Sequence, residues 1–152
     1  MILPKEIAES IARFARESYP YECCGALLGT NASVTQVLAI ANSSDEPKER
    51  RFRIRPQDFQ HAERLATQEQ LELLGFYHSH PDHPARPSAY DLEHAWPNLI
   101  YVILSIDSQQ TGELTAWLLS DDRSRFEPVE IRRGEPDGNH NFDSHTAAAL
   151  HE

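Results

Sequence analysis

Residues 75–96 have the sequence GFYHSHPDHPARPSAYDLEHAW and contain four of the chain's eight histidines. An apolar run leads into the first of these histidines, so a strand is predicted over residues 73–79, LLGFYHS. Three prolines follow within the seven residues PDHPARP (81–87), and each one removes a backbone N–H that regular structure needs. The stretch therefore predicts a strand that ends at its histidines and opens into an irregular loop.

Two histidines at the end of this strand, His78 and His80, are two positions apart. Because side chains alternate along a strand, both imidazoles project from the same face and meet at one place. The string SAYD then begins at Ser88 with the spacing of a capping box, which predicts a short helix to about Trp96. Asp91 lies one turn into that helix, and the proline-rich loop brings it back toward the histidines.

Two imidazoles and one carboxylate form a donor set that suits Zn²⁺. Three protein ligands leave the fourth tetrahedral position to water, as in catalytic zinc sites, whereas structural sites usually have four protein ligands. Simpler interpretations remain open at this point. A His-x-His pair often arises by chance, and Ser88 and Asp91 could serve only as a helix cap. His83 and His94 are more typical of surface residues than of ligands.

The rest of the chain predicts a mixed α/β fold around this site. Apolar residues at helical spacing predict a helix over residues 4–17 and a second helix of about four turns within residues 56–74. Apolar and β-branched runs predict further strands at residues 24–29, 33–42, 50–55, 99–106, 113–120 and 126–133. The strand at 99–106 has the composition of a buried central strand, and Pro128 favours a sheet edge for the last one. We expect a single domain with a curved mixed sheet of about six strands flanked by about three helices.

Composition limits the partners of this domain. The formal net charge of −10 and the isoelectric point near 5.2 argue against nucleic acid, because phosphate binding needs a basic surface. The same charge gives no attraction to an anionic membrane surface. The first residues, MILPKEIAES, lack the apolar core of a signal peptide, and no apolar run approaches the roughly 18 residues of a membrane span. We expect a cytoplasmic protein, and the sequence leaves its oligomeric state open.

The two cysteines, Cys23 and Cys24, are adjacent and so cannot link distant segments. Free thiols in a reducing compartment are the simplest interpretation. These thiols could also bind zinc or act as nucleophiles, but small buried side chains are more typical. After Arg133 the apolar periodicity ends and helix and strand breakers accumulate. We therefore expect the domain to span residues 1–133 and residues 134–152 to form a disordered tail.

The string His78-Ser79-His80-Pro81, followed by six residues, Ser88, two residues and Asp91, resembles the complete motif of the JAMM (MPN+) metalloprotease family. Fixed residue types at six positions with fixed offsets make this a specific signal, and the likeness extends over roughly residues 3–131. The resemblance implies a single MPN/JAMM-type domain in which His78, His80 and Asp91 bind Zn²⁺. We see no departure from the family pattern at these positions, unlike in MPN− relatives, which lack the ligands.

The family also carries a glutamate shortly before an apolar strand that starts near a glycine. Here Glu22 lies three residues before Gly25, in the string YPYECCGALLG. The resemblance implies that Glu22 is the general base, which takes a proton from the attacking water and delivers it to the leaving amine. It also implies that the Ser88 hydroxyl stabilises the oxyanion. Residue spacing by itself links Glu22 to nothing downstream, and a solvated loop carboxylate is the alternative.

Family members cleave peptide or isopeptide bonds at the C-terminus of ubiquitin-like proteins, and a compact domain of this kind is similar to the prokaryotic branch. The resemblance thus implies a zinc metallopeptidase whose substrate is a ubiquitin-like or sulfur-carrier protein of the β-grasp type. One alternative is a zinc amidase or peptidase that acts on small or cell-wall peptides. Another is a metal-stabilised binding module without turnover. The sequence leaves open which carrier protein, which leaving group and which divalent ion are used.

Overall fold

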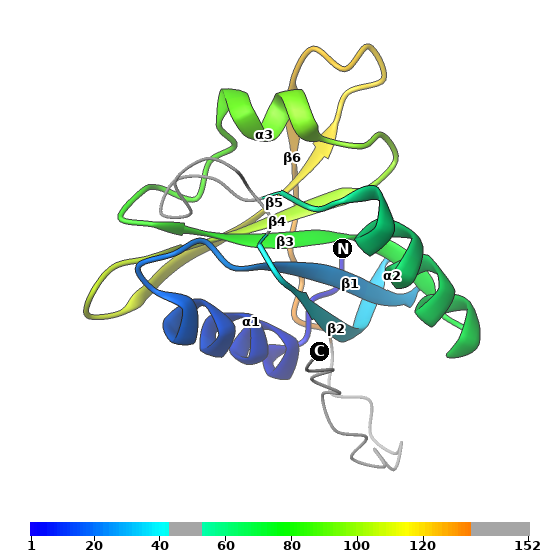
Figure 1. The fold of residues 1–152 in the computed structure, drawn as a ribbon, viewed down its shortest axis with the longest axis horizontal. Coiled ribbons are helices and arrows are strands. Elements are labelled where there is room, and N and C mark those ends of the chain that lie inside the picture. The colour runs from blue at the N-terminus through cyan, green and yellow to red at the C-terminus, as the bar shows by residue number, and fades with distance from the viewer. Residues whose placement is uncertain (43–52, 135–152) are drawn as a thin grey trace.

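The computed structural model describes residues 1–42 and 53–134 (Figure 1). These parts contain one six-stranded sheet and three α-helices, which confirms the predicted mixed α/β fold. Their order is α1 (Lys5–Ser18), β1 (Cys24–Thr30), β2 (Ser33–Ile40), α2 (Pro56–Gln68), β3 (Glu72–Pro81), α3 (Ala89–His94), β4 (Ile100–Ile106), β5 (Thr111–Leu119) and β6 (Phe126–Val129). No helix in the described ranges is both long and apolar enough to cross a membrane.

The strands lie in the order β2-β1-β3-β4-β5-β6. β3 and β4 run parallel, and the other neighbouring pairs are antiparallel. A parallel pair needs a crossover connection, and here residues 82–99 with α3 supply it. β6 lies at one end of the strand order and carries Pro128, as predicted for a strand that cannot donate at that position.

The two faces of the sheet have separate apolar cores. α1 packs on one face through Ile11 and Ala15, and Figure 1 shows α1 on the opposite side of the sheet from α3. On the other face, α2 packs its Ala62 and Ala66 against the sheet. Consecutive residues of β3 alternate between these cores, since Phe76 belongs to the α2 side and its neighbour Tyr77 to the α1 side. The strand's last side chains continue this alternation.

The prediction of a strand over residues 50–55 is wrong for residues 53–55, and residues 50–52 lie outside the described residues. In this segment, backbone donors bond to side chains in place of a neighbouring strand. The Arg53 N–H donates to Asn42 Oδ1 at 3.2 Å, and the Arg55 N–H donates to Asp58 Oδ2 at 3.2 Å. Ile54 is buried, so the apolar pattern predicted its burial correctly but wrongly predicted strand pairing.

Both later helices end for identifiable reasons. After α2, the left-handed Gln70 (φ 58°) donates to the Thr67 carbonyl, and Leu71 donates to the Ala66 carbonyl, which is a Schellman motif. α3 ends two residues before the predicted Trp96, because the residue before Pro97 is disfavoured in helical conformation. The expected tail at 134–152 lies, apart from Gly134, outside the described residues.

Candidate metal centre

Three side chains converge where β3 ends and α3 begins: His78, His80 and Asp91. The two Nε2 atoms lie 3.0 Å apart, and they lie 3.4 Å and 3.3 Å, respectively, from Asp91 Oδ2. All three side chains are buried. The histidines are on the face of β3 that Phe76 shares with α2, as the period-two argument predicted.

The spacing of these atoms fits one metal ion. Zinc held at 2.0–2.1 Å by nitrogen and 2.0–2.2 Å by oxygen requires tetrahedral ligand atoms to lie about 3.3–3.4 Å apart. The observed separations of 3.0, 3.3 and 3.4 Å are close to that edge length. Among the described residues, the group close enough to share one ion consists of these three side chains. The donor set therefore has the composition of a site that keeps one position for solvent or substrate.

The tautomer of one ligand follows from its hydrogen bond. His80 Nδ1 lies 2.8 Å from the carbonyl oxygen of Pro84, and a carbonyl can only accept, so Nδ1 carries the proton. In the neutral ring the lone pair is then on Nε2, which faces His78 and Asp91. A backbone acceptor of this type is the usual partner that orients a metal-binding histidine. Sequence analysis did not identify Pro84 as a contributor.

Burial and charge shift the pKa values of the three groups in different directions. Burial lowers the pKa of His78, and the neighbouring Asp91 carboxylate only partly opposes this effect. For His80, burial also works to lower the pKa, but hydrogen bonds with Asp91 and the Pro84 carbonyl outweigh it and raise the pKa. Burial would raise the pKa of Asp91, yet its interactions with both histidines and with the Ser88 N–H hold that pKa well below its usual range. The site thus presents an ionised carboxylate beside a neutral imidazole.

Ser88 and Asp91 form the predicted capping box. The Asp91 N–H donates to Ser88 Oγ at 3.1 Å, and the Ser88 N–H donates to Asp91 Oδ2 at 2.8 Å. The same Oδ2 atom faces both histidines, so the helix cap also fixes the orientation of the third ligand. Ser88 Oγ accepts a hydrogen bond here, and its own proton has no acceptor among the described residues. That proton is available to a ligand.

Glu22 precedes β1 and is 5% exposed. Cys24 pairs with His78 in the antiparallel register, and the Ser79 N–H donates to the Cys23 carbonyl at 3.0 Å. Continuing this register places Glu22 opposite His80, and the charge of Glu22 contributes to the raised pKa of that histidine. The structure thus brings Glu22 beside the metal centre, which residue spacing could not predict. It also lines a cavity of about 620 Å³ on the side of α1.

Among the described residues, the remaining candidates are outside the group that could hold an ion. His83 and His94 are exposed, as expected for surface residues. Cys23 and Cys24 are free and buried, and burial raises the pKa of both thiols. Neither thiol belongs to the group that could hold an ion, which agrees with the interpretation of both cysteines as small buried side chains.

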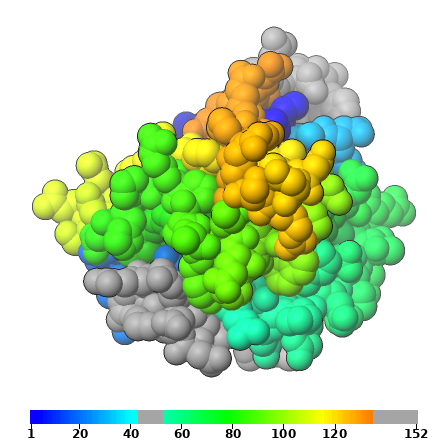
Figure 2. Space-filling model, turned by 90° about the horizontal axis from the view of Figure 1, so that it is seen from above, coloured from blue at the N-terminus to red at the C-terminus, as the bar shows by residue number. Residues whose placement is uncertain are grey.

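The loop between β3 and α3 has anchors at two further points. The Asp82 N–H donates to the Ile106 carbonyl at 2.7 Å, and the Tyr19 hydroxyl lies 3.0 Å from both Asp82 carboxylate oxygens. Farther along, Thr115 Oγ1 donates to the Ala85 carbonyl at 2.6 Å. In the view from above, this green segment lies at the surface beside the orange segment that contains β6 (Figure 2). These contacts join residues far apart in sequence, and no local pattern announces them.

Comparison with known proteins places this geometry among related chains. A family model described as prokaryotic homologs of the JAB domain matches residues 4–120. A desampylase from Pyrococcus furiosus is 34% identical over 133 residues, which cover 86% of this chain and 89% of that protein.

Two solved structures extend the comparison. A protein from Salinibacter ruber is 38% identical with a TM-score of 0.71, and the match covers 92% of this chain and 95% of that one. A JAB1/MPN domain protein from Archaeoglobus fulgidus is 18% identical with a TM-score of 0.55, covering 86% and 96% of the two chains. The second likeness concerns the fold alone.

Proposed function

This chain belongs to the prokaryotic JAB branch of the JAMM/MPN family, and from that premise we propose that it is a zinc metallopeptidase acting on ubiquitin-like proteins. The scissile bond is a peptide or isopeptide bond at the C-terminus of a ubiquitin-like or sulfur-carrier protein. A desampylase among its relatives supports a substrate in which a ubiquitin-like modifier is joined to another group.

The observation that carries the proposal is the spacing of the three donors. Nitrogen and oxygen atoms of His78, His80 and Asp91 lie 3.0–3.4 Å apart, near the ligand separation of tetrahedral zinc. These residues would hold the ion, with the fourth position open. A zinc ion held there would supply Lewis acidity, which brings the pKa of water toward about 7 and so makes a nucleophile available at neutral pH.

The chain's own residues would supply the rest of the chemistry. Glu22, buried beside His80, accepts a proton from the attacking water and passes it to the leaving amine. The Ser88 hydroxyl donates a hydrogen bond to the carbonyl oxygen as negative charge develops there. Asp91 remains ionised because its interactions with the histidines and the Ser88 N–H lower its pKa, so it stays a ligand across the neutral range.

The test uses the purified chain, stripped of metal and then supplied separately with Zn²⁺ or Mg²⁺. Its substrates are a ubiquitin-like protein joined through its C-terminal glycine to an amine, and a set of short free peptides. Mass spectrometry should detect release of the intact ubiquitin-like protein only in the zinc sample. Turnover of the free peptides without release of the ubiquitin-like protein would contradict the proposed substrate and indicate that the enzyme acts on small peptides. Zinc binding without any turnover would indicate a binding module.

A matched variant assigns the base. Glu22→Gln keeps the size and hydrogen-bonding capacity of the side chain but cannot accept a proton as a carboxylate does. We expect this variant to retain zinc, because Glu22 is outside the ligand set, and to lose about 10²–10⁴-fold in turnover. Equal turnover in Glu22→Gln and the unaltered chain would remove Glu22 from the mechanism.

A further inference from the structure

We propose that Thr115 is a positioning residue for the imidazole of His80, acting through the Pro84–Ala85 segment with its hydroxyl oriented by Trp117. This inference rests on the proposed function only in that His80 holds the metal. The five residues come from three separate parts of the chain: the end of β3, the loop after it, and β5.

Sheet register places Thr115 close to the site. Thr115 on β5 pairs with Ile103 on β4, and Ile103 pairs with His78 on β3. Residues that pair directly in this way share a face of the sheet, so Thr115 lies on the same face as the metal site. Its strand, β5, is separated from β3 by β4 alone. From there its side chain reaches the loop that crosses over this face.

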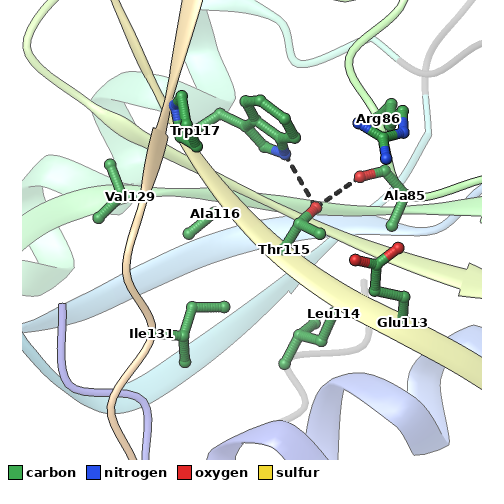
Figure 3. Close-up of a pocket in the computed structure, with 10 residues that line it drawn as sticks. Ala85, Arg86, Glu113, Leu114, Thr115, Ala116, Trp117, Val129 and Ile131 are labelled. Atoms are coloured by element: carbon green, nitrogen blue, oxygen red, sulfur yellow. Dashed lines mark hydrogen bonds between the residues drawn. The ribbon is translucent and has the colours of Figure 1, made fainter.

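The hydrogen bonds have a fixed direction. Trp117 Nε1 lies 2.8 Å from Thr115 Oγ1, and an indole nitrogen can only donate, so the threonine oxygen accepts. The single hydroxyl proton of Thr115 is then directed to the Ala85 carbonyl oxygen, 2.6 Å away. Figure 3 shows this chain of two bonds, with Trp117 above Thr115 and the Ala85 carbonyl on its other side.

The anchored carbonyl adjoins the acceptor of the metal ligand. Pro84, the residue before Ala85, accepts the Nδ1 proton of His80 at 2.8 Å and also accepts from the Arg86 N–H at 2.8 Å. The Ala85 side chain is fully buried, which restricts how the peptide units on either side can rotate. Thr115 fixes one of those units, so it limits the movement of the carbonyl that holds the His80 ring.

The anchor lies on the wall of a cavity of about 400 Å³, which guides the choice of substitution. Thr115→Val keeps the volume and branching of the side chain and removes only the hydroxyl. Alanine would leave room for a water molecule to replace that hydroxyl. Thr115→Ser restores the hydroxyl, and Trp117→Phe removes the orienting donor while keeping a ring.

The matched control is Ser105→Ala. Ser105 Oγ on β4 donates to the Glu113 carbonyl at 3.4 Å, so this variant also removes a hydroxyl-to-carbonyl bond between β4 and β5. That bond does not involve the loop. Ser105 pairs with His80 in the register of β3 and β4, so a change shared by Thr115→Val and Ser105→Ala would reflect the sheet around His80 and not the loop anchor.

Two readouts test the proposal in the full chain. The first readout is the rate at which the His80 Nδ1 proton exchanges with solvent, measured by NMR in the metal-free protein. The second is the affinity for Zn²⁺, measured by titration in competition with a chelator. We expect Thr115→Val to speed the exchange and weaken zinc binding by roughly three- to tenfold, with Thr115→Ser and Ser105→Ala close to the unaltered protein. Trp117→Phe should give a smaller change in the same direction as Thr115→Val.

Unchanged exchange and unchanged zinc affinity in Thr115→Val would overturn the positioning role, as would equal losses in Thr115→Val and Ser105→Ala. The exchange measurement needs neither metal nor substrate. An unaltered chain that fails to cleave the ubiquitin-like adduct would count against the proposed function, while the exchange rates would still decide the role of Thr115.

Discussion

The two faces of β3 differ sharply over four consecutive residues. His78 and His80 project toward α2 and α3 and form the candidate metal centre with Asp91, whereas Tyr77 and Ser79 project toward α1. Tyr77 stacks on Phe14 with ring centroids 6.4 Å apart. The comparison teaches that one strand can carry a reaction site on one face and the packing that fixes its register on the other.

The packing face is not independent of the reaction face. Ser79 Oγ accepts from the Cys23 N–H at 2.9 Å, and the Ser79 N–H donates to the Cys23 carbonyl at 3.0 Å. This double contact ties the end of β3 to the residue next to Glu22. Substitutions on the reaction face should mainly change metal binding and turnover, and those on the packing face should mainly change the free energy of unfolding. Loss of the Ser79–Cys23 contact should also have a small effect on turnover.

The largest expected effect is on the reaction face. His80→Ala removes one of three ligands and the hydrogen bond to Pro84, so we expect loss of both bound zinc and turnover. Elemental analysis of the purified variant and the cleavage assay measure these two losses. A variant that lacks the imidazole yet retains stoichiometric zinc and turnover would place the metal elsewhere.

Ser88→Ala comes next. Loss of one oxyanion donor typically costs about 10²–10³ in kcat, and loss of an N-cap side chain costs about 0.5–2 kcal/mol of stability. Metal content should be retained, because Asp91 still accepts from the backbone N–H of residue 88. Steady-state kinetics beside thermal unfolding separate the two contributions. If kcat falls no more than the loss of folded protein accounts for, Ser88 acts only as the N-cap of α3.

Gly25→Ala probes the packing face. A Cβ at this position would lie 2.3 Å from the Tyr77 hydroxyl oxygen and 2.4 Å from the Leu38 carbonyl oxygen. Because a backbone atom cannot move aside cheaply, we expect a loss of about 1–3 kcal/mol in the free energy of unfolding. Denaturant titration measures it. Zinc affinity in the folded variant should be unchanged, and a loss of affinity that exceeds the loss of stability would contradict the separation of the faces.

Ser79→Ala should have the smallest effect of the four. This substitution leaves the buried Cys23 N–H without its hydroxyl acceptor, which typically lowers the free energy of unfolding by about 1–3 kcal/mol. We expect the low end of that range, because the backbone can adjust. Turnover should fall modestly through Glu22, and zinc content should not change. Denaturant titration and metal analysis on the same sample provide the test. Zinc loss in Ser79→Ala would show that the two faces are coupled more tightly than proposed.

Local patterns predicted those parts of the molecule that local physics determines. The period-two spacing of His78 and His80 and the capping-box spacing of Ser88 and Asp91 set side-chain directions within a few residues, and the structure brings these groups together. The fold class likewise followed from runs of apolar residues. The position of Glu22 came through family resemblance, because its approach to His80 depends on the register between β1 and β3.

Contacts that depend on tertiary structure escaped prediction. The Thr115 hydroxyl meets the Ala85 carbonyl only after the crossover has folded over the sheet, and the Pro84 carbonyl meets His80 through an irregular loop conformation that no residue pattern specifies. The charged and apolar alternation at residues 53–55 predicted a strand, but hydrogen bonds to Asn42 and Asp58 side chains replaced the ladder. Two of these contacts span long sequence distances, 30 residues between Thr115 and Ala85 and 11 between Asn42 and Arg53. The other two are local, but no hydrophobic pattern encodes a hydrogen bond between a side chain and the backbone.

The parallel pairing of β3 and β4 has a consequence for the integrity of the molecule. Residues 82–99 return the chain across the sheet, and this return path carries Asp91 while the histidines stay on β3. A single proteolytic cut within residues 82–88 would leave every strand pairing in place. It would nevertheless break the direct covalent path between the histidines and Asp91, which would then be joined to them only through β4 and its pairing with β3. A nick that disturbs the proposed metal centre would thus escape an assay of secondary structure.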